Sequence, residues 1–265
     1  MDKLHVYNQF HISVDLGTLV PGVFLSRPNR FRAEVQLDSR RASAHLANPG
    51  RLTELLVPGS KVWLREAAGP HRKTSFDMVL VGHGDTLVSI DSHLPNALLR
   101  RALEAGRLPW VSADASTQCE VRLGKSRLDF LMQDRDQSRA WIEAKSVTLV
   151  DGQVARFPDA PTRRGRRHVL ELAAAVARGD AAIVVFVVQR EDAECFAPND
   201  TTDPDFGVAL REAAAGGVEV RAIRCAVASS RVSLDREIPV FLDDIPGRRY
   251  TPCHGADDGA VSRGN

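Results

Sequence analysis

The chain has 265 residues, of which 43% are hydrophobic and 26% charged, with a formal net charge of +1. These values are typical of a soluble globular protein with one or two domains. No stretch approaches the roughly 18 apolar residues of a membrane helix, and the N-terminal segment lacks the regions of a secretory signal. We therefore expect a cytoplasmic protein, away from membranes, with four reduced cysteines.

The small net charge hides segregated patches. Residues 27–51 and residues 156–178 each contain six Arg against two acidic residues, a local balance of +4, whereas residues 191–212 carry −6. Basic patches of this size can follow a polyanion such as DNA. Ordinary solvated faces are the alternative, and either patch alone leaves both interpretations open.

Residues 16–90 carry the short apolar runs of a β-rich unit. The leucines of "RLTELLV", residues 51–57, stand at helical spacing, and Pro58-Gly59 would end that helix. "SRPNR", residues 26–30, is typical of a turn. Three strands, a short helix and two strands is the order of an OB-type barrel. The predicted strands span 16–25, 31–37, 41–46, 61–67 and 76–82.

From about residue 94 the pattern changes to that of an α/β domain. Segments with apolar residues at helical spacing alternate with strand-like segments. The segment 181–189 is almost wholly apolar, as is typical of a strand at the centre of a sheet. We expect a barrel over residues 1–90, the α/β domain with a mixed sheet over 91–247, and a disordered tail over 248–265. The predicted helices lie at 94–106, 162–178 and 204–217, and the other strands at 119–123, 127–132, 141–150 and 218–225.

Charged residues interrupt two of these core strands. Glu143 and Lys145 are two residues apart and therefore share one strand face. If strand 127–132 pairs antiparallel with strand 141–150, Asp129 reaches the same face. Buried charges are costly unless they are paired or bind a metal, and two carboxylates suit Mg²⁺ or Mn²⁺. The chemistry that fits is metal-assisted phosphodiester hydrolysis, although an inert Glu–Lys pair is the alternative.

In that chemistry Lys145 would hold the nucleophile or the developing negative charge. The predicted helix after Thr162 begins with four arginines, and helix N-termini bind anions. A solvated helix end is the alternative for these arginines. Gln189 and His168 are candidates to contact and orient the residues of the site, although each can have a purely structural role. The candidate DNA-phosphate contacts are Arg27, Arg30, Arg32, Arg51, Arg163, Arg164, Arg166 and Arg167.

Longer motifs resemble those of the bacterial sugar fermentation stimulation protein family. They include "AHLANPGRLTELLVPG", "IDSHLPN", "SRLDFLM", "EAKSVTLV" and "ARFPDAPTRRGRRH". The resemblance implies an OB-like domain followed by a domain similar to the PD-(D/E)XK nuclease fold. It also implies DNA binding and a link to the regulation of sugar (maltose) metabolism genes.

The resemblance carries the metal pair over to Asp129 and Glu143 and the motif lysine to Lys145. It also implies the Ala144 backbone carbonyl as a metal ligand. Two positions depart from the pattern: Leu128 stands where the nuclease name has Pro, and Ala144 stands where the family usually has Val.

The leading interpretation is a protein that binds DNA largely independently of sequence and carries a divalent-metal nuclease-type site. A non-catalytic DNA-binding regulator is the first alternative. A binder of sugars or nucleotides through the barrel is the second. No helix-turn-helix pattern is apparent, which argues against an orthodox sequence-specific repressor.

Overall fold

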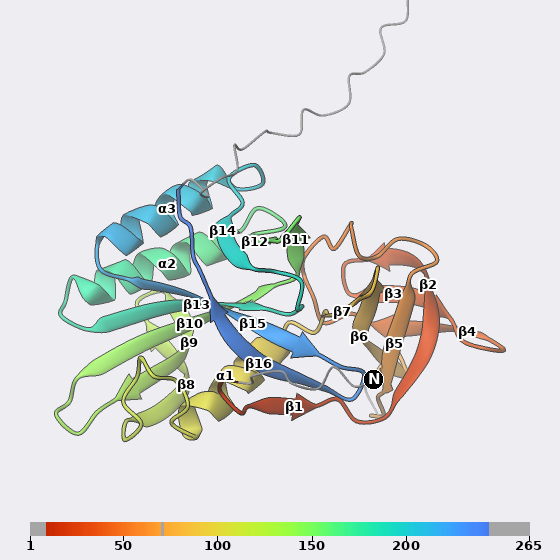
Figure 1. Ribbon diagram of the computed structural model, residues 1–265, viewed down its shortest axis with the longest axis horizontal. Helices are drawn as coiled ribbons and strands as arrows, with labels where there is room; N and C mark the ends of the chain where they lie inside the picture. The colour runs from red at the N-terminus through yellow and green to blue at the C-terminus, as the bar shows by residue number, and fades with distance from the viewer. Residues whose placement is uncertain (1–8, 70–71, 244–265) are drawn as a thin grey trace, which may run out of the picture.

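The computed structural model describes residues 9–69 and 72–243, so the expected tail over 248–265 lies outside the described residues. Two units stand side by side: a β-barrel, and a larger domain in which helices cover a twisted sheet (Figure 1). None of the helices in this part of the chain is long and apolar enough to cross a membrane.

The first unit is a closed barrel, as expected from the order of its strands. Its sheet runs β4-β3-β2-β5-β6-β7, and an additional parallel pairing of Ala44 with Phe76 joins β4 to β6 and closes it. Its interior is filled by one apolar cluster. The strands are β2 (Leu19–Asn29), β3 (Arg32–Gln36), β4 (Arg41–His45), β5 (Lys61–Glu66), β6 (Phe76–His83) and β7 (Thr86–Ser89).

Two local predictions for the barrel are wrong. The expected turn over 26–30 is mostly strand: β2 continues to Asn29 with two shifts of register, and the second shift spans Pro28. The expected helix over 51–57 is a single turn, in which the Leu56 N–H donates to the Leu52 carbonyl at 2.9 Å. Leu52 has a φ of 53°, outside the helical region. The leucines are spaced as they are because one loop inserts them into the barrel core.

The second unit contains a seven-stranded mixed sheet in the order β1-β16-β15-β13-β10-β9-β8. Helix α1 packs on one face in a first apolar cluster, and α2 and α3 pack on the other face in a second (Figure 1). The helices are α1 (Leu94–Glu104), α2 (Arg163–Val176) and α3 (Pro204–Ala215). The strands are β1 (Ser13–Asp15), β8 (Ser116–Leu123), β9 (Ser126–Gln133), β10 (Arg139–Val147), β13 (Ala181–Val188), β15 (Glu219–Val227) and β16 (Arg231–Ile238).

Several short strands were not predicted. The expected strand 141–150 divides into β10 and β11 (Leu149–Asp151), and β11 forms a small sheet with β12 (Val154–Phe157) and β14 (Cys195–Pro198). β16 and β7 also escaped notice. β1 lies within the range expected for the barrel, yet it pairs with β16 of the α/β domain. β1 and β14 depend on partners distant in the sequence, so apolar period alone does not reveal them.

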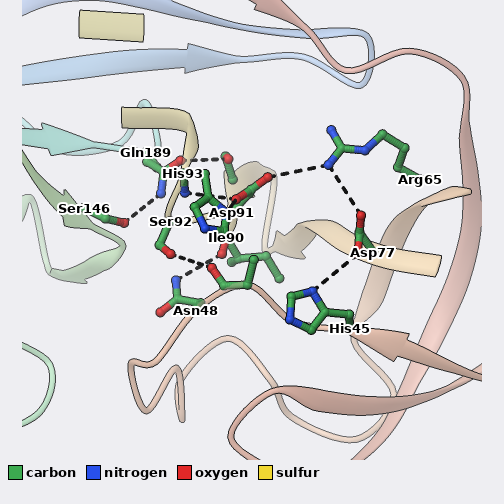
Figure 2. A network of polar contacts seen from close by, with 12 residues as sticks. His45, Asn48, Arg65, Asp77, Ile90, Asp91, Ser92, His93, Ser146 and Gln189 are labelled. Atoms are coloured by element: carbon green, nitrogen blue, oxygen red, sulfur yellow. Dashed lines mark hydrogen bonds and ion pairs between the residues drawn. The ribbon is translucent and has the colours of Figure 1, made fainter. Parts of the chain in front are cut away.

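Hydrogen bonds join the two units at the end of the central strand β13. The Gln189 side chain donates to the Ser146 hydroxyl at 2.9 Å (Figure 2). It also accepts from the Ser89 hydroxyl at 2.9 Å. Its carbonyl also accepts from the Ser89 N–H at 2.9 Å. Gln189 is fully buried. Of the two roles open to it in the sequence, Gln189 therefore takes the structural one, continuing β13 and fixing the barrel against the sheet.

Candidate metal and phosphate site

The site forms where the ladder between three strands is interrupted. The β9–β10 pairs run from Gln133 with Arg139 to Phe130 with Ile142 and stop there. The β8–β9 pairs skip the position where Glu120 and Asp129 would meet. Glu120 has a φ of 57°, a strained value for a residue that is not glycine. Asp129 thus sits in a gap between its two neighbouring strands, an irregularity of the kind that re-aims side chains at active sites.

The Asp129 carboxylate takes the place of the missing ladder bonds. Its Oδ2 accepts from the Ala144 N–H at 2.8 Å, and its Oδ1 accepts from the Asn96 side-chain amide on α1 at 2.6 Å. Burial is the main reason why the Asp129 pKa rises to about 6, and the nearby Glu143 charge adds to that rise. A neighbouring cation would favour the ionised form of a carboxyl with this pKa.

Glu143 is buried, with 3% of its surface exposed. Its Oε1 accepts from the Lys145 ammonium at 2.6 Å and also makes a short contact with Nδ1 of His168. Burial alone would raise the Glu143 pKa, but the Lys145 charge and the His168 contact outweigh it and hold the pKa low, at about 2. The other oxygen, Oε2, is buried and has no hydrogen-bond partner among the described residues.

His168 fixes the orientation of Glu143 from α2. The Arg164 Nε donates to the His168 Nε2 at 3.3 Å, which makes Nε2 the acceptor of the ring. The ring proton is then on Nδ1, where it points at Glu143 Oε1. Lys145 and His168 therefore both direct donors toward Oε1 of Glu143, Arg164 supports the far nitrogen of the His168 ring, and Oε2 of Glu143 is left unengaged.

The carboxylates open into a cavity of about 440 Å³ between the two units. Segments from outside β9 and β10 complete its wall: the barrel loop 48–50, the start of α1, the end of β12 and the start of α2. The barrel loop is fixed in place, because Arg27 donates to the carbonyls of Asn48 and Arg51 at 3.0 and 2.6 Å. A Cβ at position 50 would collide with the Asp159 carboxylate, so a larger residue there would have to displace that side chain.

The arginines predicted to contact phosphate have different roles. In the barrel, Arg27 is occupied by backbone carbonyls, and burial is the main cause that lowers its pKa. Arg32 pairs with Glu34 at 2.8 Å. Arg30 and Arg51 are exposed near the cavity loop.

On α2, Thr162 caps the helix, as expected, by accepting from the Gly165 N–H. Arg164 lines the cavity. Arg166 pairs with Asp205 at 2.6 Å, and Arg167 donates to the Ser126 hydroxyl at 3.3 Å. Arg163 is exposed. Arg164 is therefore the member of this group that faces the carboxylates.

Sequence reasoning missed the residues that complete the wall. Asn96, Asn48, Glu120 and Asp159 all line the cavity, yet none was singled out. Asn96, Asn48 and Asp159 stand in the motifs "IDSHLPN", "ANPGRL" and "RFPDAP", whose unexplained polar content is the signal for them, whereas Glu120 lies in the predicted strand 119–123. Only the fold shows that these three motifs meet around Asp129 and Glu143.

The structure defines a two-domain protein: an OB-type barrel is followed by an α/β domain with a mixed sheet, which carries a carboxylate pair and a lysine at a break between strands. The matching profiles are the SfsA N-terminal OB domain at residues 25–90 and the sugar fermentation stimulation protein RE domain at residues 93–231. The chain belongs to the sugar fermentation stimulation protein family, which confirms the resemblance of its motifs.

Relatives match over most of their length. The chain is 49% identical to the sugar fermentation stimulation protein homolog of Moorella thermoacetica over 227 residues, which cover 85% of this chain and 98% of that protein. It is 46% identical to that of Chloroflexus aurantiacus, over 84% and 86% of the two chains. The structure is similar to that of Pyrococcus furiosus SfsA in complex with Ca²⁺, with a TM-score of 0.80, 30% identity and coverage of 86% and 98%.

Proposed function

We propose that this protein binds DNA at the cavity between its domains and hydrolyses phosphodiester bonds with a divalent cation held by Asp129 and Glu143. The observation that carries the proposal is Glu143 Oε2, a buried carboxylate oxygen without a hydrogen-bond partner in the described part of the chain. A buried ionised oxygen is costly unless something positive meets it. Lys145 and His168 are both engaged with the other oxygen, so the unmet oxygen fits a cation.

The donor set is suited to a hard divalent cation. Asp129 and Glu143 offer carboxylate oxygens, the ligands that Mg²⁺, Mn²⁺ and Ca²⁺ prefer. The N–H of Ala144 meets Asp129, and the N–H and carbonyl of one strand residue point to the same side. The Ala144 carbonyl is therefore a third candidate ligand. No group of three or more His, Cys, Asp or Glu suited to a metal occurs in the described residues, so water and substrate would complete the shell.

A relative supports this assignment. Pyrococcus furiosus SfsA, 30% identical with a TM-score of 0.80, was solved in complex with Ca²⁺. A cation bound in this chain would make a bound water more acidic and offset the negative charge on a phosphate. The residues of the chain supply the rest. Lys145 is paired with Glu143 at 2.6 Å and can steady the nucleophile or the charge that develops on the phosphate.

DNA fits the cavity because its wall combines this site with groups that bind phosphate. Arg164 faces the cavity from the first turn of α2, whose free N–H groups also favour anions. Exposed Arg30 and Arg51 continue the basic surface on the barrel side. Contacts of this kind position the phosphate backbone without reading bases, so we expect little sequence preference. The connection with sugar metabolism is carried by the family's name alone.

The deciding experiment incubates purified protein with single-stranded and double-stranded DNA in Mg²⁺, Mn²⁺ or EDTA. We expect slow metal-dependent cleavage that is lost in Asp129→Asn, Glu143→Gln and Lys145→Ala. A Glu104→Gln variant purified identically removes an exposed carboxylate of α1 and serves as the control for contaminating nucleases. Equal cleavage by all variants, or none by the parent with either metal, would leave a non-catalytic DNA-binding regulator as the better description.

A further inference from the structure

The motif "IDSHLPN" places a histidine beside the carboxylate pair. His93 precedes the first residue of α1, its side chain is 80% exposed, and it lines the cavity. Asn96 follows three residues later on the same helix face and donates to Asp129. The His93 ring is thus one helical turn from a residue that touches the proposed metal ligand.

A buried carboxylate orients this ring. Asp91 Oδ1 accepts from the His93 N–H at 3.0 Å and lies 3.1 Å from the ring Nδ1 (Figure 2). Asp91 is buried, and its Oδ2 faces the Arg65 guanidinium of β5 at 3.7 Å. Because the carboxylate accepts, the ring proton of neutral His93 is on Nδ1. Nε2 faces away from Asp91 and has no hydrogen-bond partner in the described part of the chain.

A local turn explains the backbone bond but not the ring contact. An Asp that accepts from the N–H two residues later is a common turn. That turn needs only the His93 backbone, and the His93 side chain does not cap α1. A side chain without a structural role would be free to rotate into solvent. Here it is held by Asp91, which Arg65 holds in turn, so the barrel supports a ring at the edge of the cavity.

We propose that His93 is the proton donor to the leaving oxygen in phosphodiester hydrolysis and that Asp91 positions it; this rests on the function proposed above. The oxygen of a water molecule forms a bond to phosphorus while the bond from phosphorus to the leaving sugar oxygen breaks. The water loses one proton to solvent, and protonated His93 gives the Nε2 proton to the leaving oxygen. Solvent then returns a proton to His93. The products are a phosphomonoester and an alcohol, and the proton count balances.

A test of the proton donor compares leaving groups. One oligonucleotide is all-oxygen DNA, and two others carry a single sulfur in place of the 3′ or the 5′ bridging oxygen. A thiolate leaves without a proton, so it does not need His93. Positioned acid catalysis contributes about 10²–10⁴-fold, and we expect His93→Gln to slow cleavage of all-oxygen DNA by about 100-fold or more. The same variant should cleave one of the sulfur-containing strands at close to the parental rate.

Matched variants separate the possible outcomes. His45 also faces an aspartate, Asp77, at 3.4 Å but does not line the cavity (Figure 2). His45→Gln should therefore leave all three rates unchanged, whereas Glu143→Gln should abolish all three. If the parent is active and His93→Gln lowers the cleavage rate equally for oxygen and sulfur substrates, or lowers neither rate, the role of His93 is wrong while the proposed function stands. A parent that cleaves none of the substrates overturns the proposed function and this role with it.

A second measurement determines the tautomer of the His93 ring independently of catalysis. Nitrogen-15 NMR of the metal-free protein distinguishes the two neutral tautomers of each histidine. We expect the His93 resonance, assigned through its loss in His93→Gln, to show the Nδ1–H form. Asp91→Ala removes the acceptor, and the ring should shift toward the Nε2–H form that a neutral histidine side chain prefers in water. An Nε2–H ring in the parent would show that Asp91 does not set the proton, and the positioning role would be wrong.

Discussion

The Asp129 side chain accepts a hydrogen bond from the backbone N–H of Ala144 at 2.8 Å, two residues beyond the last β9–β10 pair. A side chain thus replaces a ladder bond at the point where β9 leaves both of its neighbours. Because of this replacement, a carboxylate stands beside Glu143 within the sheet, and each of the two raises the cost of ionising the other.

A divalent cation should stabilise the folded protein through Glu143. Mg²⁺, Mn²⁺ or Ca²⁺ that binds only the folded state adds about 2.7 kcal/mol at one hundred times its Kd. The melting temperature should therefore rise with added metal in the parent, and Glu143→Gln should abolish the rise. Glu104→Gln is the control and should keep it. Melting that is indifferent to all three metals in the parent would count against the site.

The metal-free protein should lose stability as Asp129 ionises. Its pKa is about 6 in the folded protein against an ordinary 3.8. The folded state therefore binds this proton more tightly than the unfolded state. The extra stability is full below about pH 4 and is lost as the pH rises through 6. A shift of this size corresponds to roughly 3 kcal/mol.

Asp129→Asn removes this titration. In EDTA, the melting temperature of the parent relative to Asp129→Asn should fall between pH 5 and pH 7.5. A hydrogen bond that the asparagine fails to make shifts the difference in melting temperature equally at every pH. The change of that difference with pH therefore reports the Asp129 titration alone. Glu143 titrates below this window, because its pKa is held at about 2. A difference that stays constant with pH would show that Asp129 has an ordinary pKa.

Arg164 should contribute more to DNA binding than Arg166. Arg164 lines the cavity, whereas Arg166, on the same turn of α2, is paired with Asp205. Each duplex phosphate that is neutralised contributes about −0.9 to the log–log salt slope of the binding constant. Fluorescence anisotropy across a salt series should show the slope weakened by about one unit in Arg164→Ala and by less in Arg166→Ala. Equal changes of the salt slope in the two variants would mean that facing the cavity does not increase the contribution of an arginine to DNA binding.

Gln189 should stabilise the junction of the two units without affecting metal binding. Its side chain joins Ser89 of the barrel to Ser146 of β10 in a buried setting. Gln189→Ala leaves both hydroxyls without that partner, at a cost of about 1–3 kcal/mol for a buried unsatisfied group. Denaturant unfolding should show this loss, while the metal-dependent shift in melting temperature persists. Gln153→Ala, at an exposed position, is the control and should change neither.

The sequence by itself determined the elements whose pattern is local. The apolar run of β13, the three long helices and the Thr162 cap follow from periodicity and end signals within a few residues of each other. Strand alternation likewise predicted that Glu143 and Lys145 share a face, and in the structure they form an ion pair. The order of the strands was enough to expect the barrel, because local apolar alternation marks each one.

The tertiary structure alone decided how the ends of these elements meet. The three leucines of the 51–57 segment have helical spacing, yet they fill the barrel from a loop, because burial in a shared core outweighs local propensity. Asp129 accepts from Asn96, which is 33 residues away in the chain (129 − 96), and it stands where the pairing of β9 with β8 skips Glu120. The cavity wall joins loops from both units. Contacts between residues so distant in sequence depend on the register and packing of whole strands, which no local period encodes.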